Sequence, residues 1–386
     1  MALERDELAG WLRLALTPGV GDVTARKLLA AFGLPDSIFE QPASALGSFV
    51  SAKQVEAMQT EPSELGLLTE KTWQWLRADP VKRRILTLGD AHYPARLLEM
   101  EDPPLMLYAL GAPEMWTGNA FGLTPSHCLA VVGSRNPTIQ GAANARQFSR
   151  VLAESQLTIV SGLALGVDSA AHEGALEGAA DDHIATVAVV GTGLDRVYPR
   201  SNFDLAHRIA QRGLILSEYP LGTPPLAANF PKRNRIIAGL SKGTLVVEAA
   251  LKSGSLITAR LAAEQGSEVF AIPGSIHSTQ SRGCHLLIKQ GAKLVENAQD
   301  VLEELAPLGQ GKIYSAADIT AALGDVSDGS SDPVWAALGY DPVGLDALLA
   351  RTGFDTASMQ VRLMELELNG QVSRLPGGLF QRLTLS

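Results

Sequence analysis

Residues 229–241 bring together side chains that bind phosphate and one that stacks on bases. Phe230 opens the run and could stack on a nucleobase. Pro231 fits the first turn of a helix, and cations there would add to backbone N–H groups that already favour anions. The polar side chains that follow are Lys232, Arg233, Asn234 and Arg235. The run predicts a phosphate-binding edge; the alternative is a solvated basic helix start with Phe230 in the core.

The same run predicts the helix that would carry these side chains. Ile236, Ile237 and Leu240 recur at the spacing of one helix face, so we expect that face to be buried. A helix that begins near Pro231 would present its cations at its N-terminal end.

Charge is distributed unevenly along the chain. The 386 residues contain 32 Lys and Arg against 41 Asp and Glu, a net charge of −9, which argues against coating duplex DNA through overall charge. Residues 126–298 hold 16 basic and 13 acidic side chains, whereas residues 1–125 hold 11 and 16, and residues 299–386 hold 5 and 12. An anion site is therefore expected only in the middle of the chain.

Composition indicates an ordinary globular protein of two or three domains, with 46% hydrophobic and 19% charged residues. Its two cysteines, Cys128 and Cys284, support neither a disulfide framework nor a cysteine-based zinc site. The N-terminus lacks the order of a signal peptide, and no apolar run reaches the roughly 18 residues of a membrane span. We therefore expect a cytoplasmic protein without membrane contact.

Short apolar segments alternate with helical runs through the middle of the chain. Segments that are apolar on both faces are typical of a parallel sheet covered by helices on each side. We therefore expect a doubly wound α/β domain at residues 81–305, with two further strands near its start. The seven main segments are residues 129–133, 158–162, 186–191, 214–218, 244–248, 269–273 and 293–295.

The N-terminal flank, residues 1–80, is expected to be a small helical domain. Leu16 to Leu29 has the order helix, Gly-Val-Gly turn and helix, which resembles the helix-hairpin-helix motif whose turn amides can hold a nucleic-acid phosphate. The alternative is a packing module whose glycines only permit a tight turn.

The C-terminal flank begins with a linker at residues 306–332, whose second half is rich in Gly, Ser, Asp and Pro. Residues 333–386 then give helices followed by a hairpin around Pro376–Gly378, the order of a winged helix. Because this segment is strongly acidic, we expect protein docking or a structural role rather than duplex reading. Its cations are Arg351, Arg362, Arg374 and Arg382.

The loops after the predicted strands share small and hydroxylated residues. Ligands of open parallel sheets bind at the carboxyl ends of the strands, where small residues let backbone amides approach an anion. Arg135 adds a planar guanidinium suited to a phosphate or a base edge. We therefore expect a phosphate-lined groove beside the basic helix. The candidate loop residues are Gly133, Ser134, Arg135, Ser161, Gly162, Ser253 and Ser255.

Catalytic and cofactor patterns are absent. There is neither a G-x-G-x-x-G after the first predicted strand nor a P-loop, and the seven histidines lack metal-ligand spacing, so we expect no cofactor and no metal. Asp168 and His172 lie four residues apart without a nucleophile beside them, and we interpret them as a helix cap and a surface residue. Glu218 and Glu248 are the carboxylates placed where a general base would lie.

Several motifs of the central region occur together: Gly133-Ser-Arg, Ser161-Gly-Leu-Ala-x-Gly-Val-Asp, Ser217-Glu-Tyr-Pro, Phe230-Pro-x-Arg-Asn-Arg and Lys252-Ser-Gly-Ser. As a set they resemble the bacterial DNA-processing protein A family, abbreviated DprA or Smf, over about residues 83–298. Members of that family often carry an N-terminal helical module and a C-terminal winged helix, in agreement with the two flanks.

The resemblance implies a non-enzymatic protein that binds single-stranded DNA, protects incoming DNA, forms a homodimer through the Rossmann domain and loads the RecA recombinase in natural transformation. By motif match, residues 133–135, 161–162 and 230–235 would line the DNA site. The family often has a DNA-contacting lysine three residues before Phe230, where this chain has Ala227.

The alternatives are an enzyme and a pure adaptor. Nucleotide phosphoribohydrolases of the same Rossmann variant use a Gly-Gly-x-Gly-Thr-x-x-Glu loop at the N-glycosidic bond. Residues 241–248 lack its leading glycines and are one residue longer before Glu248, which would turn the carboxylate to the other face of the strand. An adaptor that docks on the recombinase without binding DNA would not need Arg135 and the cations of 232–235. We therefore expect a DNA-binding protein.

Overall fold

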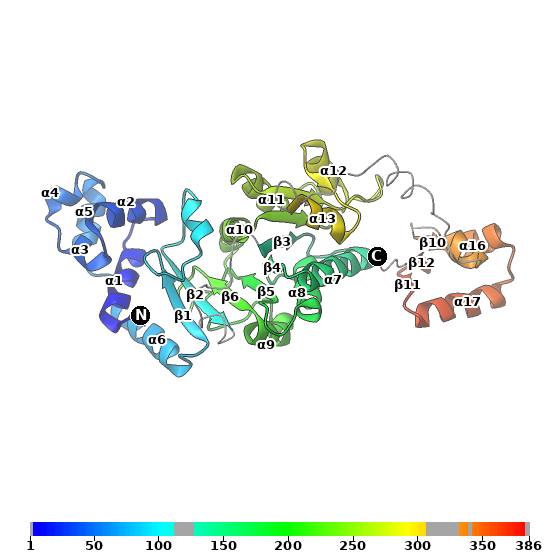
Figure 1. The fold of residues 1–386 in the computed structure, drawn as a ribbon, viewed down its shortest axis with the longest axis horizontal. Coiled ribbons are helices and arrows are strands. Elements are labelled where there is room, and N and C mark those ends of the chain that lie inside the picture. The colour runs from blue at the N-terminus through cyan, green and yellow to red at the C-terminus, as the bar shows by residue number, and fades with distance from the viewer. Residues whose placement is uncertain (1–2, 112–126, 306–331, 339–341, 383–386) are drawn as a thin grey trace.

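The computed structural model describes residues 3–111, 127–305, 332–338 and 342–382 (Figure 1). The N-terminal module is helical, as expected, and its core includes Leu8, Trp11 and Leu28. Ile85 and Tyr108 of the central sheet join the same core, so the module packs on one edge of that sheet. Its helices are α1 (Arg5–Leu16), α2 (Asp22–Phe32), α3 (Pro35–Phe39), α4 (Ala43–Leu46), α5 (Ala52–Gln59) and α6 (Leu65–Ala78).

The central domain is built on a nine-stranded sheet in the order β1-β2-β6-β5-β4-β3-β7-β8-β9. From β6 to β9 all neighbours are parallel, which confirms the doubly wound sheet, whereas β1 and β2 extend it as antiparallel strands. The strands are β1 (Arg83–Thr87), β2 (Met106–Gly111), β3 (Cys128–Val132), β4 (Thr158–Ser161), β5 (Thr186–Val189), β6 (Leu214–Ser217), β7 (Gly243–Val246), β8 (Glu268–Ala271) and β9 (Lys293–Leu294).

Helices cover both faces of this sheet, and each face has its own apolar core. One face carries α7 (Ile139–Glu154), α8 (Val167–Gly178), α9 (Phe203–Arg212) with η4 (Arg200–Asn202), and α13 (Ala298–Leu305). The other carries η1 (Ala95–Glu99), α10 (Asn229–Leu240), α11 (Ser255–Glu264) and α12 (Arg282–Lys289). Burial on both faces explains why the parallel strands are continuous apolar runs.

The order of strands reverses between β3 and β7. From β3 the chain continues outward through β4, β5 and β6, then returns to place β7 on the other side of β3. Val132 pairs with Val246, so the two strands end at the same level. The loops that follow them separate to opposite sides, which leaves a crevice at this point of the sheet.

The C-terminal module has the predicted winged-helix fold. Its core includes Val334, Leu348, Met359 and Phe380. Asp355 caps the second long helix by accepting hydrogen bonds from two backbone N–H groups, each at 3.0 Å. The elements are α15 (Pro333–Leu338), β10 (Val343–Gly344), α16 (Leu345–Thr352), α17 (Thr356–Leu368), β11 (Val372–Leu375) and β12 (Leu379–Arg382), with the sheet order β10-β12-β11.

Two further properties concern the described residues only. None of their helices is both long and apolar enough to cross a membrane. Within the same ranges, no three side chains among His, Cys, Asp and Glu are grouped to hold a metal ion. The linker expected at residues 306–332 lies outside the described residues except for Asp332.

Candidate nucleic-acid interface

A cavity of about 730 Å³ opens at the crevice between β3 and β7. We call it the strand-end cavity. Its walls come from the loop after β3, the loop after β4, the N-terminal half of α10 and the loop between β7 and α11. Of the predicted site residues it is lined by Gly133, Ser134, Arg135, Phe230, Arg233, Asn234, Ser253 and Ser255. The structure therefore brings together residues that lie up to about 120 positions apart in the sequence.

Two aromatic rings and one guanidinium form the most distinctive part of the strand-end cavity. The Phe230 and Tyr198 ring centroids lie 5.6 Å apart at an interplanar angle of 41°. The guanidinium carbon of Arg135 lies 5.5 Å from the Phe230 centroid, a cation–π distance. Tyr198 is 47% exposed and Phe230 is half-buried, so both rings can present a face to a ligand. A flat, partly desolvated base would find stacking surfaces here.

Arg233 lines the same cavity, but its guanidinium points away from the cavity opening, into the protein interior. Nη1 donates to the backbone oxygen of Val189, and Nη2 lies 4.0 Å from Asp168. Burial lowers the pKa of Arg233, whereas the nearby Asp168 carboxylate raises it. Gly162 makes room for this side chain, because a Cβ there would overlap the guanidinium. Arg233 thus holds strand ends together rather than facing solvent.

Asp168 and His172 both differ from our interpretation as a helix cap and a surface residue, because the N-cap of α8 is Gly166 and Asp168 lies within the helix. Asp168 accepts hydrogen bonds from the N–H groups of Gly162 at 3.2 Å and Ala164 at 3.3 Å, so it organises the loop before α8. Burial raises the pKa of Asp168, and Arg233 opposes that rise. His172 is not a surface residue but fully buried, where desolvation lowers its pKa to about 3. The sheet covers this face of α8, which the sequence did not reveal.

Hydroxyl and amide groups line the opposite wall. The hydroxyls of Ser253 and Ser255 lie 2.7 Å apart at the start of α11, where the N–H groups of Ser255, Leu256 and Ile257 already donate to Ser253 and Gly254. The Asn234 side chain donates to the Gly254 carbonyl at 3.4 Å and so joins α10 to this loop. Lys252 is exposed beside them. This wall therefore offers a ligand the two serine hydroxyls and one exposed cation.

Two predicted site residues of α10 lie outside the strand-end cavity. Positions 230, 233, 234 and 237 share one helix face, whereas Lys232 and Arg235 share another. Arg235 is buried and contacts Glu218 at 2.5 Å and Asp22 at 3.2 Å. Lys232 lies 3.3 Å from the same Glu218 oxygen. The three cations and one side-chain amide of residues 232–235 therefore do not form one surface.

Ser161 is also removed from the cavity surface. It is fully buried, and its hydroxyl donates to the backbone oxygen of Val131 at 2.7 Å. This bond joins β4 to β3 just below the crevice. The residue therefore supports the strand ends instead of offering a donor to a ligand.

The two candidate general bases are engaged elsewhere. Glu248 accepts hydrogen bonds from Thr138, at 2.9 Å from its backbone N–H and 2.5 Å from its hydroxyl, at the N-terminus of α7. Burial raises the pKa of Glu218, and Arg235 opposes that rise. Neither carboxylate lines the strand-end cavity.

The helix-hairpin-helix candidate is present as α1, a turn with Gly19 at φ +80°, and α2. Its second helix docks on the central domain, because Arg26 donates to the carbonyls of Leu98 at 2.9 Å and Met100 at 2.8 Å. The first turn of α2 carries Asp22, which already contacts the cations of α10. An acidic, docked first turn favours the interpretation as a packing module.

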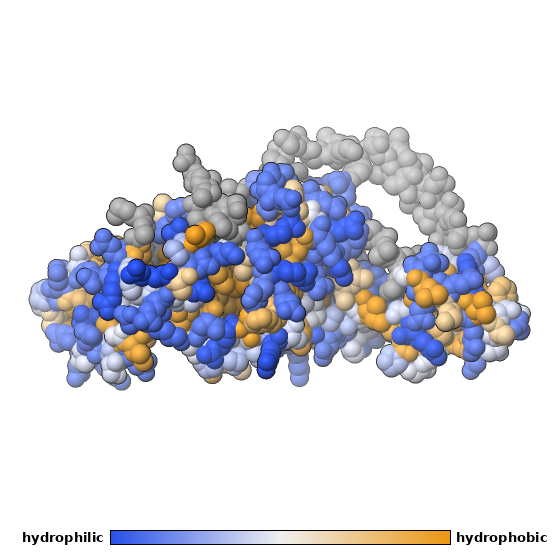
Figure 2. All heavy atoms as spheres, turned by 90° about the horizontal axis from the view of Figure 1, so that it is seen from below, coloured by the Kyte–Doolittle hydropathy of each residue, from blue (hydrophilic) through white to orange (hydrophobic). Residues whose placement is uncertain are grey.

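The winged helix shows no free cation on its long helix α17 in the described part of the chain. Arg362 of α17 pairs with Asp332 and Glu365, each at 2.6 Å. The exposed side of α17 instead carries Val361, Met364 and Leu368, and Figure 2 shows orange, hydrophobic atoms on this module. Arg351 donates a hydrogen bond to the Ala337 carbonyl, and the guanidinium groups of Arg374 and Arg382 lie over the rings of Phe380 and Trp335, respectively.

Sequence reasoning missed two side chains of the cavity. Tyr198 comes from the loop after β5 and Lys252 from the loop after β7. Lys252 begins the Lys252-Ser-Gly-Ser motif, and its position after a predicted strand could have identified it as a residue of the site. Tyr198 lies nine residues beyond the end of β5, so no local pattern pointed to it. Ala227, where the family often has lysine, also lines the cavity.

Comparison with known proteins agrees with this architecture. The chain matches the sequence profile of DNA recombination-mediator protein A over residues 84–306 and that of the DprA winged helix domain over residues 318–378. Protein Smf of Synechocystis is 35% identical over 98% of this chain and 100% of its own length. Protein Smf of Escherichia coli is 40% identical over 80% and 79% of the two chains.

A relative with a solved structure also resembles this chain, in both sequence and fold. DNA processing protein DprA of Streptococcus pneumoniae is 48% identical over 56% of this chain and 72% of its own. Its X-ray structure superposes with a TM-score of 0.60 and covers 80% of this chain and 100% of that chain, at 36% identity. The family resemblance read from the motifs is thus confirmed, and the chain belongs to the DNA-processing protein A (DprA/Smf) family.

Proposed function

We propose that this chain is a DNA-processing protein that binds single-stranded DNA in the strand-end cavity. The observation that carries the proposal is the grouping of Phe230 and Tyr198 with the exposed cations Arg135 and Lys252. Bases in a duplex hide their faces in the stack, so only an unpaired strand can place a base on these rings. Asp168, the one carboxylate that lines the cavity in the described residues, is engaged by backbone N–H groups.

A salt titration tests this proposal. Fluorescence anisotropy of labelled oligo-dT and of a matched duplex should show preferential binding of the single strand at every salt concentration. Each phosphate contact should contribute about −0.7 to the slope of log K against log salt. The exposed Lys53 of α5 provides a control, because Lys53→Ala should leave the slope unchanged. Equal affinity for duplex and single strand would contradict the proposal.

The finer role that we propose is delivery of the bound strand to the RecA recombinase. Family membership supports it, since the matching profile is described as a recombination mediator. RecA should assemble faster on single strands coated with a single-strand-binding protein when this chain is added, measured as DNA-dependent ATP hydrolysis. Arg135→Ala should reduce that stimulation. No stimulation by the unmodified chain would remove this part of the proposal.

We also propose a homodimer through the β9 edge of the Rossmann domain. Leu294 of β9 is 49% exposed, and Leu251 and Leu286, which are 54% and 38% exposed, line a groove of about 620 Å³ between α11 and α12. A second copy would cover these leucines and the open strand edge together. Light scattering should give a dimer for the unmodified chain and a monomer for Leu294→Glu. Unchanged mass in that variant would place the interface elsewhere.

Finally, we propose a binding protein without nucleotide hydrolase activity. Glu248, the candidate catalytic carboxylate, is held at the N-terminus of α7 by Thr138. Incubation with nucleoside monophosphates should release no free base. Release that disappears in Glu248→Gln would favour the enzyme instead.

A further inference from the structure

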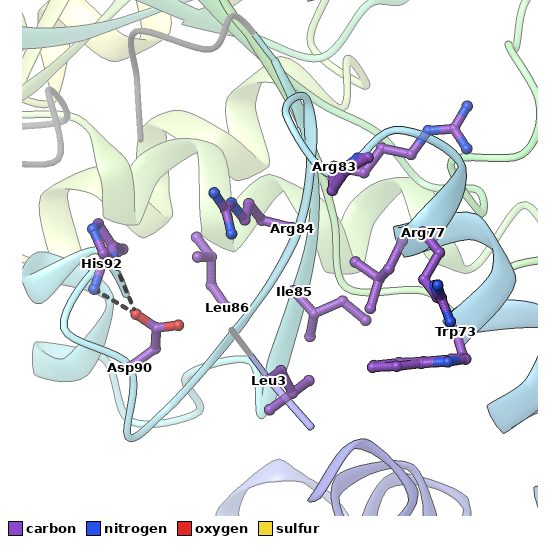
Figure 3. Close-up of a pocket in the computed structure, with 11 residues that line it drawn as sticks. Leu3, Trp73, Arg77, Arg83, Arg84, Ile85, Leu86, Asp90 and His92 are labelled. Atoms are coloured by element: carbon purple, nitrogen blue, oxygen red, sulfur yellow. Dashed lines mark hydrogen bonds and ion pairs between the residues drawn. The ribbon is translucent and has the colours of Figure 1, made fainter. Parts of the chain in front are cut away.

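A second cavity, which the proposed function does not use, lies between α6 and β1 (Figure 3). Its volume is about 360 Å³. We call it the sheet-edge cavity. Among its lining residues, Trp73, Leu76 and Arg77 come from α6, and Ile85 and Leu86 come from β1. It is therefore formed where the N-terminal module meets the outermost strand of the central sheet.

The sheet-edge cavity extends across the open side of β1. Successive side chains of a strand point to opposite faces, and Figure 3 shows Leu86 on one side of the strand and Ile85 with Trp73 on the other. A cavity lined by both Ile85 and Leu86 must reach around the edge of the strand. Within the described residues, β1 has β2 as its one strand neighbour.

The hydrogen-bond register shows which backbone groups face this edge. Gly111 N–H donates to Lys82 C=O, and Leu88 N–H donates to Leu105 C=O, so the even-numbered residues of β1 face β2. The odd-numbered residues then point away from β2, because an antiparallel ladder alternates. Arg83 N–H and Thr87 C=O on that side bond within the chain, to Asp79 and Asp90. The central residue, Ile85, directs both its N–H and its C=O toward the sheet-edge cavity.

The chemistry of the lining is apolar with a positive rim. Trp73, Leu76 and Ile85 supply the apolar surface, and Arg77 is exposed above it. The lining contains one carboxylate, Asp90, which accepts hydrogen bonds from the backbone N–H and Nδ1 of His92 at 2.7 and 3.1 Å. Acidic groups of a ligand are therefore favoured over basic ones.

Arg83 has a fixed position on the same rim. Its Nη1 donates to the Trp75 carbonyl at 3.0 Å, and its guanidinium carbon lies 5.2 Å from the Trp75 ring centroid. A cation held by packing offers its charge to a ligand with little loss of side-chain entropy. Arg84, on the opposite face of the strand, gives the rim a cation on that face as well.

We propose that the sheet-edge cavity binds an extended acidic peptide segment of a partner protein, added as a further strand to β1. Its central residue would exchange two hydrogen bonds with Ile85 and, if apolar, would pack on Trp73 and Leu76. The residues next to it would point to the opposite face, toward Arg84, and those two positions away would point toward Arg77 and Arg83. The expected pattern is an apolar residue flanked on both sides by Asp or Glu.

A peptide titration with the full chain tests the proposal. The probe is a fluorescein-labelled, end-blocked Gly-Asp-Asp-Leu-Asp-Asp-Gly, followed by anisotropy at low salt. Saturable binding is expected, together with slower amide hydrogen exchange at Ile85. N-methylation of the leucine should weaken binding about five- to tenfold, because it removes a backbone donor. Replacement of every Asp by Lys should abolish binding.

Variants of the chain separate this surface from general charge attraction. Arg77→Glu should weaken the Asp peptide about tenfold or more, whereas Lys53→Glu, an exposed charge reversal on α5 of the same module, should not. Oligo-dT affinity should remain unchanged in Arg77→Glu. Three outcomes would overturn the proposal: no peptide binding, equal binding of the N-methylated peptide, or full displacement by AMP, which would indicate a small-anion site.

Discussion

The two sides of α10 differ in what they face. On one side, Phe230 and Asn234 border an open cavity with the exposed Arg135. On the other side, Lys232 and Arg235 face the carboxylates of Asp22 and Glu218. A cation already paired with carboxylates would have to exchange those partners for a phosphate, with little net gain. Positive charge in a sequence therefore indicates an anion site only where no carboxylate folds against it.

The acidic side of α10 has a structural role instead. Asp22 belongs to the N-terminal module, whereas Glu218 and Arg235 belong to the central domain. Their contacts tie the two parts together behind the strand-end cavity. One side of the helix thus stabilises the contact between the two parts, whereas the proposed DNA binding concerns the other side, and each role can be tested separately.

Arg235→Ala is expected to have the largest effect on the free energy of unfolding. Removing this buried guanidinium leaves Glu218 buried without its closest partner, which typically costs about 3–5 kcal/mol of unfolding free energy. Urea denaturation followed by circular dichroism measures the loss. Lys232→Ala is the control, since the ammonium group of Lys232 is half-exposed and such a cation contributes about 0–1 kcal/mol. Similar losses in both variants would contradict a buried structural role for Arg235.

Phe230→Ala should have the largest effect on binding. Loss of a stacked ring costs about 1–3 kcal/mol per base, roughly 5- to 150-fold in Kd for oligo-dT. The unfolding midpoint should change much less than in Arg235→Ala, and Phe230→Trp should retain affinity. Unchanged affinity in Phe230→Ala would return the ring to a purely structural role.

Arg135→Ala and Lys252→Ala should each flatten the salt dependence of oligo-dT binding. If each side chain contacts one phosphate, each slope should change by about 0.7. Lys232→Ala should leave the slope as it is, because its ammonium group faces Asp22 and Glu218. A slope that changes with Lys232 and not with Arg135 would reverse the assignment of the two sides.

Ala227→Lys should add a contact with a DNA phosphate at a position where the strand-end cavity now has only a methyl group. Ala227 is exposed and lines the cavity, so a lysine would enter no packed core. The log–log salt slope should steepen by about 0.7, and affinity at low salt should rise. Lower affinity would show that the bound strand does not pass this wall.

Arg362→Ala on α17 should have the smallest effect on DNA affinity and on stability. Its guanidinium is engaged by Asp332 and Glu365, so neither oligo-dT nor duplex affinity should change. The stability of the winged helix should change little, because solvent screens this surface pair. A clear loss of duplex binding would identify this helix as a DNA reader.

Local patterns predicted most of the fold. The runs at residues 129–133 and 244–248 are apolar on both faces, and they became β3 and β7 of a parallel sheet. The spacing of Ile236, Ile237 and Leu240 predicted the buried face of α10. Such predictions succeed because the period of a helix or strand is written within a few consecutive residues. The loops Gly133–Arg135 and Ser253–Ser255 could therefore be placed at one end of the sheet.

The sequence by itself thus determined the sheet, its helices and the edge at which the candidate site lies. Only the tertiary structure decided which cations remain available to a ligand. The Asp22 partner of Arg235 lies 213 residues away, and the Arg233 guanidinium fills the space left by Gly162 on another strand end. Neutralisation and burial depend on groups that folding brings together from distant segments. No local period records them, so charge counts alone could not separate the two sides of α10.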